Sequence, residues 1–165
     1  MTNVHPLIVH FPVALLSLYV IIECLSIFSR KINNKFFNSK LLLLFVWTIW
    51  ALLALSSWEI AEKIIWNSEL VYLHSEIAEQ MYTIYITITI IYIIKIIIQK
   101  NYIKYYKDIQ EKLDTILSSR IVKICIVLLS LCGFVLLSIT GALGAAITHG
   151  PDIDPIVQFI YNLFL

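Results

Sequence analysis

Charged residues are scarce in this chain. Asp, Glu, Lys and Arg make up 14% of its 165 residues, whereas a soluble domain usually carries about 25%. Hydrophobic residues reach 60%, and the mean hydropathy is +0.88. So few charges cannot cover the surface of an ordinary soluble domain. The composition therefore predicts a membrane protein, whose first partner is the lipid bilayer.

Motifs for enzymatic and nucleic-acid chemistry are also missing. Cys24, Cys125 and Cys132 lie in apolar runs, without the Cys-x-x-Cys-His of covalent haem attachment and without a disulfide framework. We interpret them as small packing residues. The sequence has no Ser-His-Asp order, phosphate-binding glycine loop, His-Glu-x-x-His or nucleic-acid motif. No catalytic nucleophile can be named, and nucleic acid is not expected as a partner.

The apolar runs predict an all-α, integral membrane four-helix bundle. A helix needs roughly 20 apolar residues to cross the hydrocarbon core. Ile and Thr alternate near residue 87 as in a strand, but an unpaired strand in lipid would leave its backbone groups unsatisfied. We expect one membrane domain over residues 1–165, with a short interfacial helix in the apolar tail 152–165. The predicted spans are about 11–29, 41–62, 77–98 and 121–147.

The sequence also suggests where the helices begin and what joins them. Pro12 suits the first turn of the first helix, because its missing N–H has no partner there. The polar stretch 32–39 reads as a connection, and the stretch 67–75 as a link that contains His74. Ser75 is a possible N-cap of the third helix. The Lys-rich stretch 99–119 is expected to hold an amphipathic interfacial helix.

Basic residues predict the orientation. The side opposite to the termini carries eleven of the twelve, and the other side has only Lys63. By the positive-inside rule the basic side faces the cytoplasm or an organelle matrix, and both termini face outward. This predicts a multi-pass protein of the bacterial inner membrane, or of the mitochondrial inner membrane. The eleven are Arg30, Lys31, Lys35, Lys40, Lys95, Lys100, Lys104, Lys107, Lys112, Arg120 and Lys123.

Histidines are few, and the predicted topology brings all four to the outer face: His5, His10, His74 and His149. Cofactor sites in bundles are often built from side chains on facing helices. Two imidazoles could clamp a b-type haem. Three or four could instead bind zinc or copper. His5 and His10 are five residues apart, about 140° around a continuous helix, so we expect His10 to face inward and leave His5 open.

Glycines on the fourth span bear on the haem hypothesis. Gly141 and Gly144 would leave room for a flat ring near His149. Small residues equally let helices pack closely, as Gly141 and Ala145 would, and the sequence favours packing.

Glu23 lies inside the first span, where an unpaired carboxylate is costly. It could relay protons. The alternatives are that it is simply protonated or that it pairs with Lys95, which the run lengths place at a similar depth. Acidic residues on the outer face, such as Glu76 and Asp152, could attract a basic soluble cytochrome, although such residues are usually a solvated rim.

Two motifs resemble a known family. The run from His5 through His10 and Pro12 to Leu16 reads His-Pro-x-x-Val-His-Phe-Pro-x-Ala-Leu-Leu, and Thr140 to Gly150 reads Thr-Gly-x-x-Gly-x-x-x-x-His-Gly. Both resemble the bacterial membrane proteins of domain-of-unknown-function family 2231, over essentially the whole chain. The resemblance implies a four-helix inner-membrane module whose neighbourhood includes c-type cytochromes, with motif histidines at His5, His10 and His149.

Our leading hypothesis is therefore a membrane-embedded electron-transfer protein of a respiratory chain. It binds haem b near the outer face through His10 and either His149 or His74. A non-catalytic accessory subunit of a respiratory complex is a second hypothesis, since the tail is apolar and no nucleophile is present. A copper- or zinc-binding or transport protein is the third.

Overall fold

The computed structural model describes residues 5–62, 69–100 and 107–165, and in these ranges the chain is helical with no strand. The predicted all-α class is confirmed. Four helices, α1 (His5–Phe28), α2 (Arg30–Glu62), α3 (Glu69–Gln99) and α5 (Arg120–His149), are long and apolar enough to cross a membrane. Helix α4 (Lys107–Leu117), the single turn η1 (Pro151–Ile153) and α6 (Pro155–Phe164) complete the described chain. The protein is a multi-pass membrane protein.

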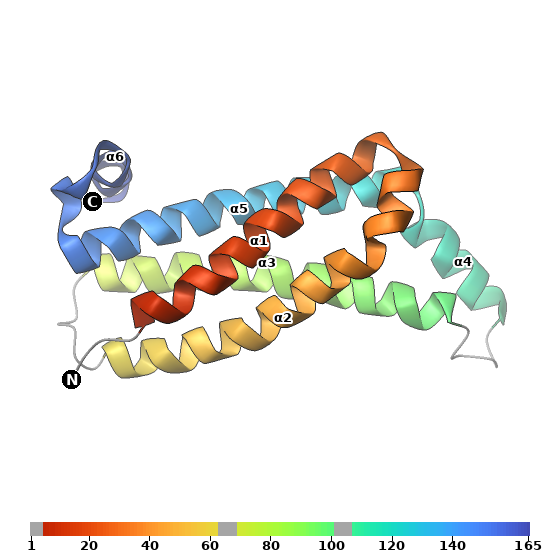
Figure 1. Ribbon diagram of the computed structural model, residues 1–165, viewed down its shortest axis with the longest axis horizontal. Helices are drawn as coiled ribbons and strands as arrows, with labels where there is room; N and C mark the ends of the chain where they lie inside the picture. Colours follow the sequence, from red (N-terminus) through yellow and green to blue (C-terminus); the bar gives the residue numbers. More distant parts are fainter. Residues whose placement is uncertain (1–4, 63–68, 101–106) are drawn as a thin grey trace.

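The four long helices alternate in direction and form a ring in which α1 packs on α2, α2 on α3, α3 on α5 and α5 on α1. Figure 1 shows the start of α1 and the short helix α6 at one end of the bundle, with α4 at the other. We call the first the histidine end, where α3 begins and α5 finishes. The opposite end, where α1 meets α2, is the lysine end. Which end faces outward stays a prediction.

Helix α2 begins eleven residues before the predicted span, so the expected connection over 32–39 is wrong. Only Ser29 separates α1 from α2, and the Asn33 backbone N–H donates to the Ser29 carbonyl at 3.0 Å. Hydropathy marks where a helix enters lipid, whereas backbone hydrogen bonding can start earlier, in the interface. The first turns of α2 run at an angle to the rest of the helix (Figure 1).

Two other predicted starts are also corrected. Helix α3 begins at Glu69, so Ser75 is no N-cap and His74 lies inside the helix. Helix α1 begins at His5, which puts Pro12 in its interior, and Pro6 takes the first-turn position. In the third span, the alternating Thr and Ile run is helical, and its threonine hydroxyls find partners within the helix. Thr87 and Thr89 donate to the carbonyls four residues earlier, at 2.8 and 2.7 Å.

The two short helices were expected in part. Helix α4 lies in the predicted interfacial stretch, of which residues 101–106 fall outside the described chain. Helix α6 is preceded by its N-cap, Asp154, whose carboxylate accepts from the N–H groups of Ile156 and Val157. Val157 packs on Ala142 and Ala146 at the end of α5. The location of α6 in the membrane interface stays a prediction, as does the single-domain boundary.

Aromatic residues fill the centre of the bundle. Tyr19 of α1 and Tyr85 of α3 are fully buried and meet edge to face, with ring centroids 6.2 Å apart. Trp47 of α2 packs against Tyr85 at 5.4 Å. On α5, Gly133 admits the Tyr85 ring, since a Cβ there would lie 2.7 Å from Tyr85 Cε2. These contacts fix the relative depth of all four helices.

Candidate functional site

His74 is the histidine that the fold brings inside. It shares a buried face of α3 with Val71 and Ile77, and its exposed fraction is 8%. Its Nδ1 lies 3.0 Å from the backbone carbonyl of Thr140 on α5. Because a carbonyl only accepts, Nδ1 carries the proton, and in a neutral imidazole the lone pair is then on Nε2. The Trp58 ring of α2 packs at 4.7 Å between centroids.

Gly144 allows this placement. A Cβ at Gly144 would meet His74 Cε1 at 3.2 Å, so the missing side chain makes room for the imidazole. The sequence had suggested room for a flat ring there, and the space is filled by His74 instead. Gly141 differs, because a Cβ at that position would meet no atom within 4 Å.

Thr140 has a further unusual feature. Its Oγ1 is buried and makes no hydrogen bond within the described residues. Elsewhere on α5 the hydroxyls of Ser130, Ser138 and Thr148 each donate to the carbonyl four residues earlier. An unsatisfied buried polar group costs about 1–3 kcal/mol. The orphaned hydroxyl is therefore a polar position that a bound group at this level could satisfy. We define the His74 site as His74, Trp58, Thr140 and Gly144.

The other histidines stand apart from this site in different ways. His10 lies nine residues before Tyr19 and His74 lies eleven before Tyr85, about 14 and 17 Å along their helices at 1.5 Å per residue. Because Tyr19 and Tyr85 meet, His10 and His74 have similar depths. His149 is five residues beyond Gly144 and nine beyond Thr140, about 8 to 14 Å farther toward the end of α5, and is exposed. The side chain of His5 lies outside the described part of the chain.

The expectation that His10 faces inward is wrong, because its side chain is exposed. The buried face of α1 follows Pro12, Leu16, Tyr19 and Glu23. His10 is two residues before Pro12, about 200° around the helix. Since α1 stays helical through Pro12, nothing turns His10 back toward the core.

A second polar cluster lies in the lysine half of the bundle. Lys40 Nζ is 3.0 Å from Glu23 Oε2, and these residues are 0% and 4% exposed. The Tyr92 hydroxyl donates to the same carboxylate oxygen at 2.6 Å, and Lys40 also donates to Asn33 Oδ1 at 2.9 Å. The predicted pairing of Glu23 with Lys95 is therefore wrong. The Lys95 ammonium lies over the Phe37 ring instead, 5.5 Å from its centroid.

The cluster continues toward the middle of the membrane. The Tyr92 and Tyr19 rings meet edge to face, with centroids 6.4 Å apart. The Ser130 hydroxyl lies 3.3 Å from the Tyr19 hydroxyl oxygen, and the Tyr85 hydroxyl donates to the Ser130 carbonyl at 3.0 Å. All four long helices contribute. We call this set the Glu23 network: Glu23, Lys40, Asn33, Tyr92, Tyr19, Ser130 and Tyr85.

Sequence reasoning found Glu23 and missed the rest of the network. A carboxylate in the middle of a span predicts that it has a partner. That this partner is Lys40 depends on the early start of α2. The tyrosines could not be predicted as members of the network, because a tyrosine in an apolar run can lie either at the membrane interface or in a core.

Metal-ligating side chains do not gather in the described parts of the chain. No group of three or more His, Cys, Asp or Glu residues there is placed to hold a metal ion. The described residues thus give no geometric support to a zinc or copper site.

Comparison with known proteins identifies the chain at the level of its family. The family described as "Predicted membrane protein (DUF2231)" matches residues 1–152, which confirms the resemblance seen in the sequence. Neither a curated protein nor a solved structure matches significantly.

Proposed function

This chain belongs to the DUF2231 family of predicted membrane proteins, and we propose that it is an electron-transfer protein that binds b-type haem at the histidine end. His74 would be the residue that holds the haem iron, through Nε2. The proposal places the protein in a bacterial inner membrane, or in the mitochondrial inner membrane, with its histidine end facing outward. A c-type cytochrome or a respiratory complex is the redox partner.

The orientation of His74 carries this proposal. Ligating histidines usually donate their second ring N–H to a carbonyl or carboxylate, which fixes the tautomer and the ring. The Nδ1 contact with the Thr140 carbonyl supplies this donation within a helix pair. An apolar bundle also suits a porphyrin, and the open position beside Gly141 and the orphaned Thr140 hydroxyl lie at the same level. When bound, haem supplies the one-electron chemistry that this chain's own side chains lack.

Depth favours His10 over His149 as the second ligand. His10 lies within about 3 Å of the His74 level along the helix axes, whereas His149 is about 8 to 14 Å beyond it. His10 is exposed on α1, a helix that lies diagonally opposite α3 in the ring, so a haem held by both histidines would require the start of α1 to turn toward His74. The chain then contributes ligands, orientation and an apolar setting.

Optical spectroscopy of the purified protein tests the proposal. We expect haem bands in the reduced-minus-oxidised spectrum, together with about one haem per chain by chemical assay. His74→Ala should abolish the bands, and His10→Ala should weaken them and change the spin state. His149→Ala is the matched control and should leave them unchanged.

A second variant covers the case in which His74→Ala fails to fold. Gly144→Ala brings a methyl to 3.2 Å from His74 Cε1, so it should disturb the bound haem while retaining the imidazole. A folded wild-type protein without haem bands would contradict the proposal. Loss of haem in His149→Ala with retention in His10→Ala would contradict the ligand assignment.

A non-catalytic accessory subunit is the second candidate, favoured by α6. Ile156, Phe159 and Leu163 on this short helix are 65–70% exposed. Such an apolar surface can lie on lipid or cover a partner subunit. Extraction in a mild detergent, followed by mass measurement, distinguishes the two, because a subunit should retain its partners. A monodisperse single chain would contradict the subunit hypothesis.

A further inference from the structure

The Glu23 network is more than an ion pair that cancels two charges. Polar contacts join Asn33 on the lysine side to Lys40, Lys40 to Glu23, and Glu23 to Tyr92. The Tyr92 ring meets the Tyr19 ring edge to face at the centre of the bundle. Lys40 alone would be enough to neutralise Glu23. A buried carboxylate that also contacts a hydroxyl is an arrangement in which a proton can move between positions.

Lys40 has supports that do not depend on Glu23 being charged. Its ammonium donates to Asn33 Oδ1 and lies over the Tyr92 ring, 5.4 Å from the centroid. An amide oxygen and an aromatic face both stabilise a buried cation. Lys40 therefore keeps favourable contacts if a proton from solvent binds to the Glu23 carboxylate. The Tyr92 hydroxyl, which now donates to Oε2, would then accept from the new carboxylic acid.

The network lies closer to the lysine end of the bundle than to the histidine end. Tyr92 is seven residues from Gln99, at the lysine end of α3, and 23 residues from Glu69, at the histidine end. These separations are about 10 Å and 35 Å along the helix. Toward the histidine end, the buried apolar side chains of Leu16, Trp47 and Leu137 follow the two central tyrosines. The lysine side therefore offers the shorter route for a proton.

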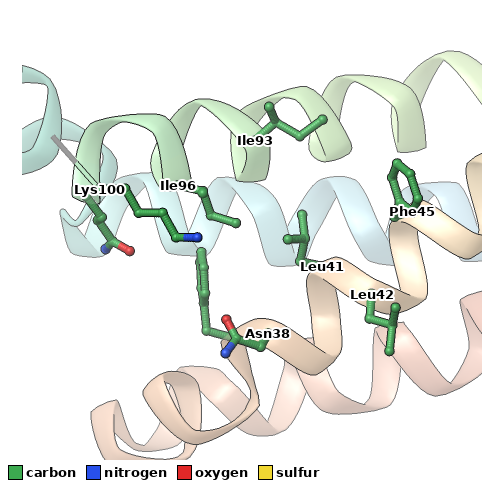
Figure 2. Close-up of a pocket in the computed structure, with 9 residues that line it drawn as sticks. Asn38, Leu41, Leu42, Phe45, Ile93, Ile96 and Lys100 are labelled. Atoms are coloured by element: carbon green, nitrogen blue, oxygen red, sulfur yellow. The ribbon is translucent and has the colours of Figure 1, made fainter. Parts of the chain in front are cut away.

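A lateral cleft of about 600 Å³ between α2 and α3 shortens this route further. Figure 2 shows Asn38 and Lys100 at one end of the cleft and Phe45 at the other. Phe37 also lines the cleft, and its ring stacks on Tyr92 with centroids 5.4 Å apart. Phe37 thus contacts both the cleft and Tyr92, the residue whose hydroxyl donates to Glu23.

We propose that Glu23, with Lys40 and Tyr92, is an internal proton-binding site that exchanges protons with the lysine end of the bundle. The site is neutral when Glu23 is ionised and carries one positive charge after the proton binds. It operates whether or not haem is present at the histidine end.

Charged and titratable groups surround Glu23 from every helix packed against it. Lys40 comes from α2, Tyr92 and Lys95 from α3, and Tyr19 and Cys24 from α1 itself. Lys123 of α5 faces Lys40 and Lys95. Asp114 of α4 faces Lys95. Lys40, Lys95 and Lys123 together create a positive field that any proton entering from this side must cross.

Infrared difference spectroscopy of the full chain in lipid nanodiscs tests the proposal. As the pH is stepped down, the C=O stretching band of a protonated carboxylic acid should appear for Glu23. Glu23→Gln should lose this band, and Tyr92→Phe should shift its frequency, because a hydroxyl in contact with the carboxyl is gone. Glu79→Gln, a change at an exposed carboxylate of α3, is the matched control and should retain the band.

The route is tested by the rate at which the Glu23 acid exchanges into heavy water. Phe37→Ala should accelerate exchange about tenfold, the effect of removing about 1.4 kcal/mol from a barrier. Phe45→Ala, in the same cleft but away from the network, should not. Leu137→Ala opens the opposite side and should also leave the rate unchanged. Phe37→Leu gives a smaller acceleration and serves if the alanine variant does not fold.

Two results would overturn the proposal. The first is a carboxylate that stays ionised at every pH at which the protein remains folded, which would make Glu23 and Lys40 a structural ion pair. The second is exchange that Leu137→Ala accelerates as much as Phe37→Ala, which would remove the preference for the lysine end.

Discussion

The His74 site and the Glu23 network are both polar clusters inside an apolar bundle, but they differ in completeness. In the network each charged group has a partner within 3.0 Å, and four helices supply the contacts. At the His74 site one imidazole is oriented by a carbonyl, while the adjacent Thr140 hydroxyl has no partner among the described residues. Buried polar groups are normally satisfied. The charged groups of the network are therefore satisfied by the protein itself, whereas the Thr140 hydroxyl at the His74 site could still accept a hydrogen bond from a bound group or donate one to it.

This difference makes a general prediction about variants. Changes in the Glu23 network should destabilise the fold itself. Changes at the His74 site should act mainly on what the site binds. The following predictions test that contrast from the largest expected effect to the smallest.

Lys40→Met should have the largest effect. It leaves the Glu23 carboxylate buried without its cation, and breaking a buried pair in this way costs about 3–5 kcal/mol. The free energy of unfolding, measured by reversible denaturation in mixed micelles, should fall by about that amount. The double variant Glu23→Gln with Lys40→Met should recover most of the loss, because neither charge remains. A loss below about 1 kcal/mol in the single variant would mean that the pair is not buried in the membrane.

Gly133→Ala should destabilise the bundle more moderately. The new Cβ would lie 2.7 Å from Tyr85 Cε2, and Tyr85 is fully buried and held by its hydrogen bond to Ser130. Overpacking of a core costs about 1–3 kcal/mol, against a gain of at most about 1 kcal/mol from replacing glycine in a helix. Unfolding measurements should therefore show a net loss of about 1–2 kcal/mol. An unchanged or higher stability would show that the tyrosine can move aside.

Tyr85→Phe should cost less, because it removes one hydrogen bond and keeps the ring. Interhelical hydrogen bonds in membrane proteins contribute about 0.6 kcal/mol on average and about 1.7 at most. The same unfolding assay should give a loss of about 1 kcal/mol. Tyr82→Phe, on the same helix and also packed on Trp47, is the control outside the network. Equal losses in the two variants would remove the network's special contribution.

Gly141→Ala should leave stability unchanged or raise it by up to about 1 kcal/mol, because glycine is the weaker helix former and its Cβ would meet no atom. The same variant should lower haem content, since it takes up space beside Thr140. The opposite signs at Gly133 and Gly141 would separate the two regions within one helix. Destabilisation at Gly141 would mean that this face of α5 is packed rather than open.

Several features follow from the sequence for direct physical reasons. Apolar runs of membrane-spanning length require four helices, because lipid leaves the backbone no other way to satisfy its hydrogen bonds. Because consecutive spans alternate in direction, His10, His74 and His149 all lie toward the same end of the bundle. The motif from His5 to Leu16 was sufficient to indicate the family. The need of Glu23 for a partner was also predictable from its position in a span.

The rest required contacts between distant segments. His10 points away from the core because α1 continues as a helix through Pro12. The sequence alone does not show whether a helix continues through a proline or ends there. Gly144 and Gly133 look alike in the sequence, yet one makes room for the His74 imidazole and the other for the Tyr85 ring. Lys40 rather than Lys95 meets Glu23, because α2 starts early and turns its first residues over the bundle.

The sequence by itself thus determined that the protein lies in lipid, how many helices span it, which family it belongs to and which histidines are available. These depend on composition and local length, which each segment carries alone. The tertiary structure decided which histidine is buried, which lysine neutralises Glu23 and which glycines have a neighbouring side chain in the space that a Cβ would occupy. Those outcomes depend on the rotation and depth of each helix relative to its neighbours, and they are set by the interlocking of Tyr19, Trp47 and Tyr85 at the centre of the bundle.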